Sequence, residues 1–173
     1  MKKLKLYEYI IYTAAILVGI GLDQLTKLLA VKYLKPVASV PIIKDVLHLT
    51  FVTNDGMAFG MLDDKRWIFM SVSVIMIAVL GYLLYAGRLE NKLYKISVSM
   101  IISGGIGNMI DRIMLGEVID FVDFCLIDFA VFNVADSIVC IGAGLLVLAL
   151  VLEIIEEGKK DKQKKAEEAK DAE

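Results

Sequence analysis

The stretch from Gly104 to Phe124 reads GGIGNMIDRIMLGEVIDFVDF, and its character changes halfway along. It begins apolar and glycine-rich, as helices packed inside a membrane often do, and then collects polar and charged side chains. These are Asn108, Asp111, Arg112, Glu117, Asp120 and Asp123. A charge at the centre of a bilayer costs at least about 3 kcal/mol, so we hypothesise that such residues have a function. They lie where an apolar run ends, which predicts a site at the membrane interface.

The rest of the chain has the composition of an integral membrane protein. Of its 173 residues, 58% are hydrophobic, and the mean hydropathy is +0.68. Four apolar runs are long enough to predict four transmembrane helices, with the third expected to continue past Arg112 because the run itself is short. The runs span residues 9–22, 67–85, 96–110 and 131–152.

Two segments between these runs read as short strands. Val46 to Val52 is rich in β-branched and aromatic residues, and Val118 to Phe124 alternates apolar and acidic ones. Two prolines between Ala30 and Pro41 end the first helix, and Asn54-Asp55-Gly56 is a turn signal. The fold class expected is therefore an all-α membrane protein with four transmembrane helices and a small β element.

Basic residues decide the orientation in the membrane. Lysines 2, 3 and 5, the short basic loop 87–95 and the tail lysines all fall on one side of a four-span topology, which predicts cytoplasmic termini. Residues 1–155 are expected to form the membrane domain, and 156–173 a solvated, frayed or disordered cytoplasmic tail. The unusual polar residues then gather at the outer face: Asp23, Lys27, Asn54, Asn108, Arg112, Asp120, Asn133 and Asp136.

Several function classes lack support in the sequence. No basic patch carries interleaved aromatic residues, so no nucleic-acid partner is expected. Cys125 and Cys140 form no C-x-x-C motif, and the single histidine, His48, belongs to no H-E-x-x-H motif. The sequence therefore predicts neither a metal site nor a cofactor.

The spacing of the polar residues suggests a carboxylate pair. Asn133 and Asp136 share a helix face, and Asp120, in the preceding loop, is expected to fold back beside Asp136. Two half-buried carboxylates share a proton, which suits peptide hydrolysis by general acid and base. Asn108 and Arg112 would orient the carboxylates or nearby loops, and Asn54 would hold the substrate backbone. Asp23 and Lys27, taken alone, read as a solvated ion pair at a helix end.

The chain resembles bacterial lipoprotein signal peptidase, the type II signal peptidase. The matching stretches are Asp23 to Lys27, Asn54 to Gly60, the Gly104–Phe124 block with its Gly-Asn-x-x-Asp-Arg and V-x-D-F patterns, and Phe132 to Asp136. The resemblance implies an aspartic endopeptidase of the bacterial cytoplasmic membrane. It would cut signal peptides from prolipoproteins just before the diacylglyceryl cysteine.

The resemblance also assigns roles. Asp120 and Asp136 match the catalytic pair, and a small extracytoplasmic β-cradle is implied. The implied partners are prolipoproteins, membrane lipids and globomycin-like cyclic peptide inhibitors, and the enzyme is expected to act as a monomer. Asp55, Met57 and Ala130 depart from the pattern of many relatives. The residues that match the pocket are Asp23, Lys27, Asn54, Gly56, Asn108, Arg112 and Asn133.

Three other classes remain open from the residues. A small membrane transporter or proton channel also places Asp and Arg within a membrane, although no inverted repeat is visible. A serine–lysine hydrolase would use Lys27 with Ser103 or Ser137, although neither serine lies in a recognisable nucleophile motif. A purely structural bundle would use the acids only as ion-pair partners.

Overall fold

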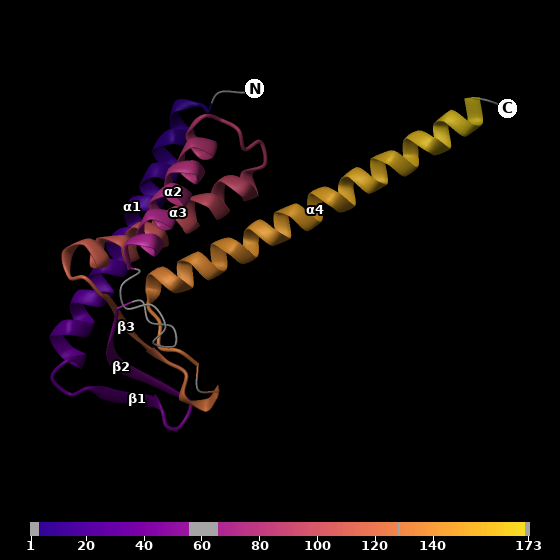
Figure 1. The fold of residues 1–173 in the computed structure, drawn as a ribbon. Coiled ribbons are helices and arrows are strands. Elements are labelled where there is room, and N and C mark those ends of the chain that lie inside the picture. Colours follow the sequence, from indigo (N-terminus) through magenta and orange to yellow (C-terminus); the bar gives the residue numbers. More distant parts are fainter. Residues whose placement is uncertain (1–3, 56–65, 128, 172–173) are drawn as a thin grey trace.

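Four helices and a three-stranded sheet make up the fold (Figure 1). The computed structural model describes residues 4–55, 66–127 and 129–171. The helices are α1 (Leu6–Leu29), which continues as a π-helical turn η1 (Ala30–Leu34), α2 (Arg66–Tyr85), α3 (Lys92–Met114) and α4 (Val134–Asp171). The predicted fold class is confirmed, and the third helix does continue past Arg112.

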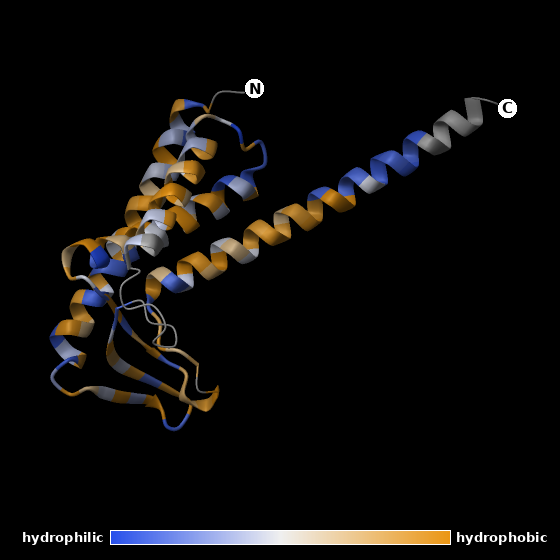
Figure 2. Ribbon diagram, in the orientation of Figure 1, coloured by the Kyte–Doolittle hydropathy of each residue, from blue (hydrophilic) through white to orange (hydrophobic). Residues whose placement is uncertain are grey.

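Length and composition agree with membrane insertion. Three helical stretches are long and apolar enough to cross a bilayer: Leu6–Leu34, Lys92–Met114 and Val134–Lys164. The apolar part of α2, Met70–Tyr85, is shorter. Large apolar side chains are exposed along α1, α2 and α4, as expected for surfaces that face lipid. Figure 2 shows hydrophobic residues along most of these helices.

Helix α3 is the centre of the bundle, because it packs against α1, α2 and α4. Its glycines allow the close approach to α4: a Cβ at Gly104 would overlap the backbone oxygen of Ala135. Helix α4 then diverges from the other helices toward its C-terminus (Figure 1). Figure 1 also shows both ends of the chain on the side of the helices away from the sheet.

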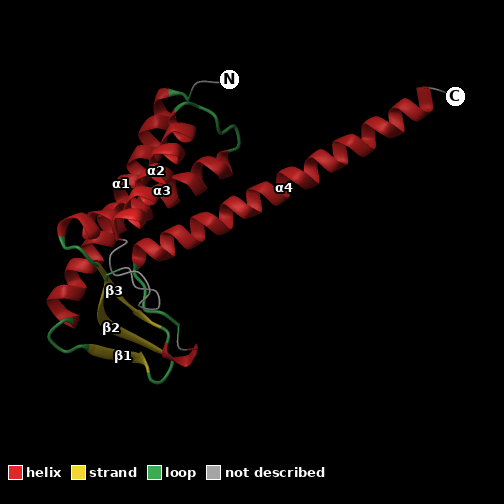
Figure 3. Cartoon of the chain, in the orientation of Figure 1, coloured by secondary structure: helices red, strands yellow, loops and turns green. Residues whose placement is uncertain are grey.

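The sheet lies at one end of the helices and has the order β1-β2-β3, all antiparallel (Figure 3). Its strands are β1 (Ser39–Ile43), β2 (Leu47–Asn54) and β3 (Val118–Asp123). The two predicted strands are present within two residues of their expected bounds. Strand β1 was not predicted, because Pro41 disfavours strands, but an edge strand tolerates a proline.

An apolar cluster joins the sheet to the helices. Ala30 and Leu34 at the end of the first helix pack with Ile119 and Phe121 of β3. These four side chains are buried, with 3–9% of their surface exposed. The contact fixes β3, which carries Asp120, against the end of α1.

The C-terminal tail has a regular backbone structure. Helix α4 continues without a break to Asp171, and the side chains from Val151 to Lys164 are exposed. Lysine, glutamate and alanine are good helix formers, and Glu156 and Lys160 form an exposed i,i+4 ion pair of 2.7 Å. The sequence suggested a solvated, frayed or disordered tail, and its described part, up to Asp171, is helical.

Candidate active site

The start of α4 is held by a reciprocal capping arrangement. The Asn133 side-chain oxygen accepts a hydrogen bond of 3.0 Å from the Asp136 backbone N–H, and Asp136 Oδ2 accepts one of 3.1 Å from the Asn133 N–H. This is a capping box in which Asn replaces Ser or Thr and Asp replaces Glu. It fixes the position of the Asp136 carboxylate in the first turn of the helix, where the helix dipole favours an anion.

The same capping residue binds Asp120. Val122 and Phe132 form backbone hydrogen bonds of 2.8 and 3.0 Å. These bonds place the residues before α4 next to β3. Asn133 therefore reaches Asp120, and its Nδ2 donates a hydrogen bond of 2.7 Å to Asp120 Oδ1. One asparagine thus contacts both carboxylates.

Asp120 is almost completely buried. Its residue surface is 2% exposed, and its second oxygen accepts a hydrogen bond of 3.0 Å from Asn54 Nδ2. Burial raises the pKa of Asp120 above its usual value of 3.8, and the nearby charge of Asp136 raises it further. The hydrogen bonds from Asn54 and Asn133 and the charge of Lys27 lower the pKa and offset only part of this rise.

Asn108 connects the carboxylates to the first helix. Its Nδ2 donates a hydrogen bond of 2.7 Å to Asp136 Oδ1. Its Oδ1 accepts hydrogen bonds from Lys27 Nζ at 2.8 Å and from Asn133 Nδ2 at 3.0 Å. Side chains from α1, α3, α4 and β3 therefore form one continuous hydrogen-bonded network.

Lys27 is the buried cation of this network. Its Nζ lies 2.9 Å from Asp23 Oδ2 and 2.8 Å from Asp111 Oδ2, and the three side chains are 0–3% exposed. Asp23 Oδ1 accepts a hydrogen bond of 2.9 Å from the Ala135 N–H in α4. The interpretation of Asp23 and Lys27 as a solvated helix-end pair is therefore wrong. The reason is that α3 and α4 cover this face of α1, which no local spacing reveals.

Two members of the network, Asp111 and Gln24, were given no role by the sequence reasoning. Asp111 is the second carboxylate partner of Lys27, and its Oδ2 also accepts a hydrogen bond of 3.3 Å from the Ile119 N–H. Gln24 Nε2 donates to Asp111 Oδ1 at 2.9 Å and to the Gly107 oxygen at 3.2 Å. The available signal was the i,i+3 spacing of Asn108 and Asp111, which places both on one face of α3.

Arg112 is the predicted site residue least integrated into this network. Its side chain is half-buried and donates a hydrogen bond of 3.4 Å to the Asn108 backbone oxygen. Within the described ranges it forms no ion pair with Asp120 or Asp136. Gly56 and Met57, which belong to the second motif, lie outside the described residues.

The serine–lysine alternative finds no support in the described part of the chain. Ser103 Oγ donates to the Ile16 oxygen at 3.0 Å, and Ser137 Oγ donates to the Asn133 oxygen at 3.0 Å. Lys27, as described above, contacts Asp23, Asp111 and Asn108. Both serines thus satisfy helix carbonyls, and neither is hydrogen-bonded to the lysine.

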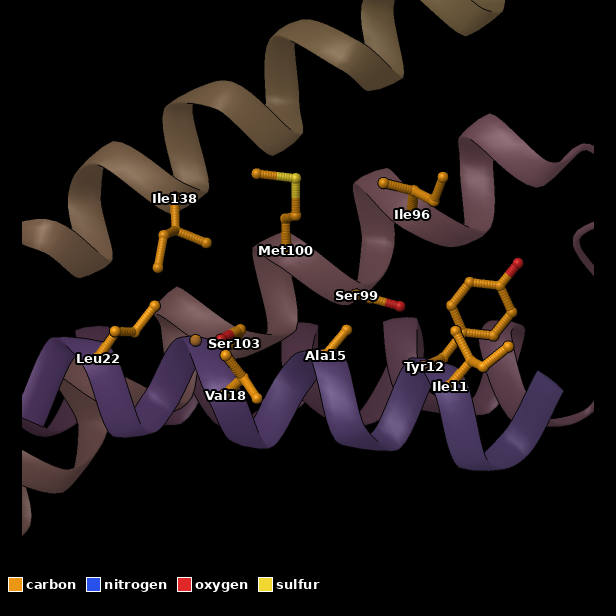
Figure 4. A pocket seen from close by; sticks show the side chains of 11 residues that line it. Ile11, Tyr12, Ala15, Val18, Leu22, Ile96, Ser99, Met100, Ser103 and Ile138 are labelled. Atoms are coloured by element: carbon orange, nitrogen blue, oxygen red, sulfur yellow. The ribbon is translucent and has the colours of Figure 1, made fainter. Parts of the chain in front are cut away.

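A separate apolar cavity lies between α1, α3 and α4. It has a volume of about 330 Å³, and side chains such as Val18, Leu22, Met100 and Ile138 project into it (Figure 4). No Asp, Glu, Lys, Arg or His lines it. The cavity suits an apolar occupant, and the groups capable of proton transfer lie in the polar network instead.

Fold and site together define a multi-pass helical membrane protein with a buried carboxylate and amide network where the helices meet a small sheet. A family model described as "Signal peptidase (SPase) II" matches residues 15–152. The chain belongs to this signal peptidase II family, and it is a membrane-bound protease.

Relatives and solved structures agree with this assignment. A "Lipoprotein signal peptidase" from Brevibacillus brevis is 43% identical over 83% of this chain and 93% of its own. Another, from Caldanaerobacter subterraneus, is 50% identical over 72% of this chain and 85% of its own. A solved "Bacterial membrane enzyme" structure superposes with a TM-score of 0.75 at 31% identity, covering 83% of this chain and 89% of its own.

Proposed function

We propose that this protein is an aspartic endopeptidase that uses Asp120 and Asp136 to remove signal peptides from diacylglyceryl-modified prolipoproteins. Cleavage falls just before the lipidated cysteine. The observation that carries the proposal is the hydrogen bonding of Asn133 to both carboxylates. The "Lipoprotein signal peptidase" relatives support the choice of substrate.

The chemistry follows from a pair of carboxyl groups that holds one proton. The ionised carboxylate takes a proton from a water molecule, whose oxygen attacks the scissile carbonyl carbon, while the protonated carboxyl group donates its proton to the carbonyl oxygen. The tetrahedral intermediate collapses as the C–N bond breaks: the proton taken from water passes to the leaving amine, and a hydroxyl group of the intermediate returns a proton to the other carboxylate. The raised pKa of Asp120 supports this, because it keeps a proton on the pair at higher pH.

Asn54, Asn108 and Asn133 orient the carboxylates, and Asp23 and Lys27 brace the helices beneath them. Arg112 is assigned to holding a nearby loop, and Gly56 is assigned to supporting the pocket, as the family pattern implies. In this assignment the polar network, not the apolar cavity, is where the peptide bond is cut.

The proposed location is the outer face of the bacterial cytoplasmic membrane, with both termini cytoplasmic. The distribution of lysine and arginine supports this orientation. So do the positions of both chain ends, away from the sheet (Figure 1). The sheet is then the extracytoplasmic cradle, and the charged tail of residues 156–173 is cytoplasmic. We propose that the enzyme acts as a monomer among membrane lipids, and that globomycin-like cyclic peptides occupy its site.

The test is a gel-shift assay with a purified diacylglyceryl-modified prolipoprotein and the full-length enzyme in detergent or lipid. Asp120→Asn and Asp136→Asn are each expected to lower the cleavage rate at least ~100-fold, because each removes a group that transfers a proton. Asp45→Asn is the matched control. It makes the same change on an exposed residue of the β1–β2 turn, where φ is 58° and asparagine is well tolerated.

Cleavage by the wild type and by Asp45→Asn should be blocked by globomycin. Near-full activity of either site variant would refute the carboxylate mechanism. Proton or solute flux through proteoliposomes without any cleavage would favour the transporter or channel alternative.

A further inference from the structure

Three side chains with metal-binding chemistry come together in the sheet. His48 on β2 lies opposite Asp123 on β3 in the antiparallel register. Cys125 follows two residues later, at the start of the short 3-10 helix η2 (Cys125–Ile127). An imidazole nitrogen, a carboxylate oxygen and the sulfur of these residues lie within 4.8 Å of one another. Strand pairing and a turn thus assemble a cluster that the sequence does not reveal.

The imidazole has an unsatisfied nitrogen. Among the described residues, His48 Nε2 is shielded from solvent and has no hydrogen-bond partner. Leaving a buried polar atom without a partner is unfavourable, so such an atom calls for an explanation. A metal ion bound through this nitrogen would satisfy it, because neutral imidazole binds metals through its unprotonated nitrogen.

The carboxylate is held in place by further hydrogen bonds. Thr50 Oγ1 donates to Asp123 Oδ2 at 2.8 Å, and the Ser39 and Thr50 hydroxyl oxygens lie 2.9 Å apart. The Thr50 hydroxyl group thus helps to orient the carboxylate within the cluster. Hydrogen-bond donors that orient a ligating side chain without binding the metal themselves are typical of metal sites.

We propose that His48, Asp123 and Cys125 bind a divalent transition-metal ion of the Zn²⁺ class. One nitrogen, one oxygen and one thiolate sulfur suit borderline ions, whereas Mg²⁺ and Ca²⁺ require mainly oxygen ligands. In a tetrahedral zinc site neighbouring ligand atoms are about 3.5 Å apart, so small side-chain rotations close the cluster around an ion. Three protein ligands leave the fourth position for water or another small ligand.

Such a site would stabilise the sheet rather than take part in peptide cleavage. The ion would link β2, the end of β3 and η2, and so strengthen the strand that carries Asp120. Metal binding and proteolysis are therefore separate properties. The site can be tested by binding and unfolding measurements that are independent of the proposed peptidase activity.

The experiment uses the full-length protein, purified metal-free and reduced in detergent, and titrated with Co²⁺ as a spectroscopic probe and with Zn²⁺. We expect a thiolate-to-cobalt charge-transfer band that saturates at one ion per chain, with Zn²⁺ displacing Co²⁺ and raising the melting temperature. Cys125→Ser and His48→Gln should each weaken binding at least tenfold. Cys140→Ser, which changes an exposed cysteine on α4, is the matched control and should bind like the wild type.

Two results would overturn the proposal. One is the absence of a cobalt–thiolate band from the wild type. The other is an undiminished band in Cys125→Ser together with its loss in Cys140→Ser. Melting temperatures in the absence of metal report whether each variant is folded, and Asp123→Asn provides an independent ligand variant, expected to weaken binding while leaving the thiolate band visible at high Co²⁺.

Discussion

Lys27 Nζ and Asp111 Oδ2 form an ion pair of 2.8 Å in which the two side chains are only 2% and 3% exposed. The pair joins α1 to α3 within the membrane-spanning part of the protein. A second carboxylate, from Asp23, contacts the same ammonium at 2.9 Å. The buried lysine is thus surrounded by oxygen atoms, which is the arrangement that makes burial of a charge tolerable.

Replacing the buried cation should therefore be costly. Lys27→Met leaves two buried carboxylates without their counterion, and removing one partner of a buried ion pair costs about 3–5 kcal/mol. We expect a much lower yield of folded protein and a clearly lower melting temperature in detergent. Lys160→Met is the matched control, because its i,i+4 pair with Glu156 is exposed and contributes little to stability. Equal melting temperatures for the two variants would contradict this prediction.

The structural role of the capping residue Asn133 should be separable from its role in positioning Asp120. Asn133→Ser keeps an N-cap oxygen for α4 but loses the Nδ2 that donates to Asp120, so the protein should fold while cleavage slows at least ~10-fold. That hydrogen bond lowers the pKa of Asp120. Its loss therefore raises this pKa, and the alkaline limb of the pH–rate profile should move to higher pH.

The control for Asn133→Ser is Asn91→Ser, the same change at the N-cap of α3, where the side chain accepts a hydrogen bond of 2.8 Å from the Leu93 N–H. The cleavage rate of Asn91→Ser and its pH–rate profile should be the same as those of the wild type. A slower Asn133→Ser enzyme with an unmoved alkaline limb would argue for a structural role alone.

Asp120→Asn should abolish activity without destabilising the fold. Burial raises the pKa of Asp120 above 3.8, so the folded state holds this proton more tightly than the unfolded state does. The group's contribution to stability is complete below pH 3.8 and is lost as pH rises through the folded-state pKa. At pH values above that folded-state pKa, the wild type carries a buried negative charge that the variant lacks.

The melting temperature of Asp120→Asn should accordingly equal or exceed that of the wild type above the folded-state pKa of Asp120, and the difference should shrink on acidification. Thermal unfolding across a pH series measures both, with Asp45→Asn, the same change on an exposed residue, as the control. A variant less stable than the wild type at every pH would show that Asp120 chiefly stabilises the fold.

The close contact of α3 with α4 predicts a strong effect of a single methyl group. In Gly104→Ala the new Cβ would overlap the Ala135 backbone oxygen and lie 2.7 Å from Val139 Cγ2, so the helices must separate. Overpacking of this kind costs about 1–3 kcal/mol, and because α4 carries Asp136, cleavage should slow as well. In Gly144→Ala the new Cβ meets no atom within 4 Å, so stability should be unchanged or slightly raised. Equal melting temperatures would show that the helix contact is not tight.

The sequence by itself determined the parts that depend on local pattern. Apolar runs of sufficient length indicate the helices, β-branched and aromatic residues indicate β2, and alternation indicates β3. Polar residues at the ends of the apolar runs predicted where a site would lie. Asp120 and Asp136 stood out because acids at such places are rare.

Only the tertiary structure decided which polar groups contact one another. Asp23 accepts a hydrogen bond from a residue 112 positions away, and Lys27 contacts one 81 positions away. Sequence spacing predicts side-chain contacts only within about one helical turn. It therefore suggested that Asp23 and Lys27 are solvated, and it did not predict the ion pair with Asp111. Burial is a property of the packed helices, and it alone turns a surface ion pair into the core of a hydrogen-bonded network.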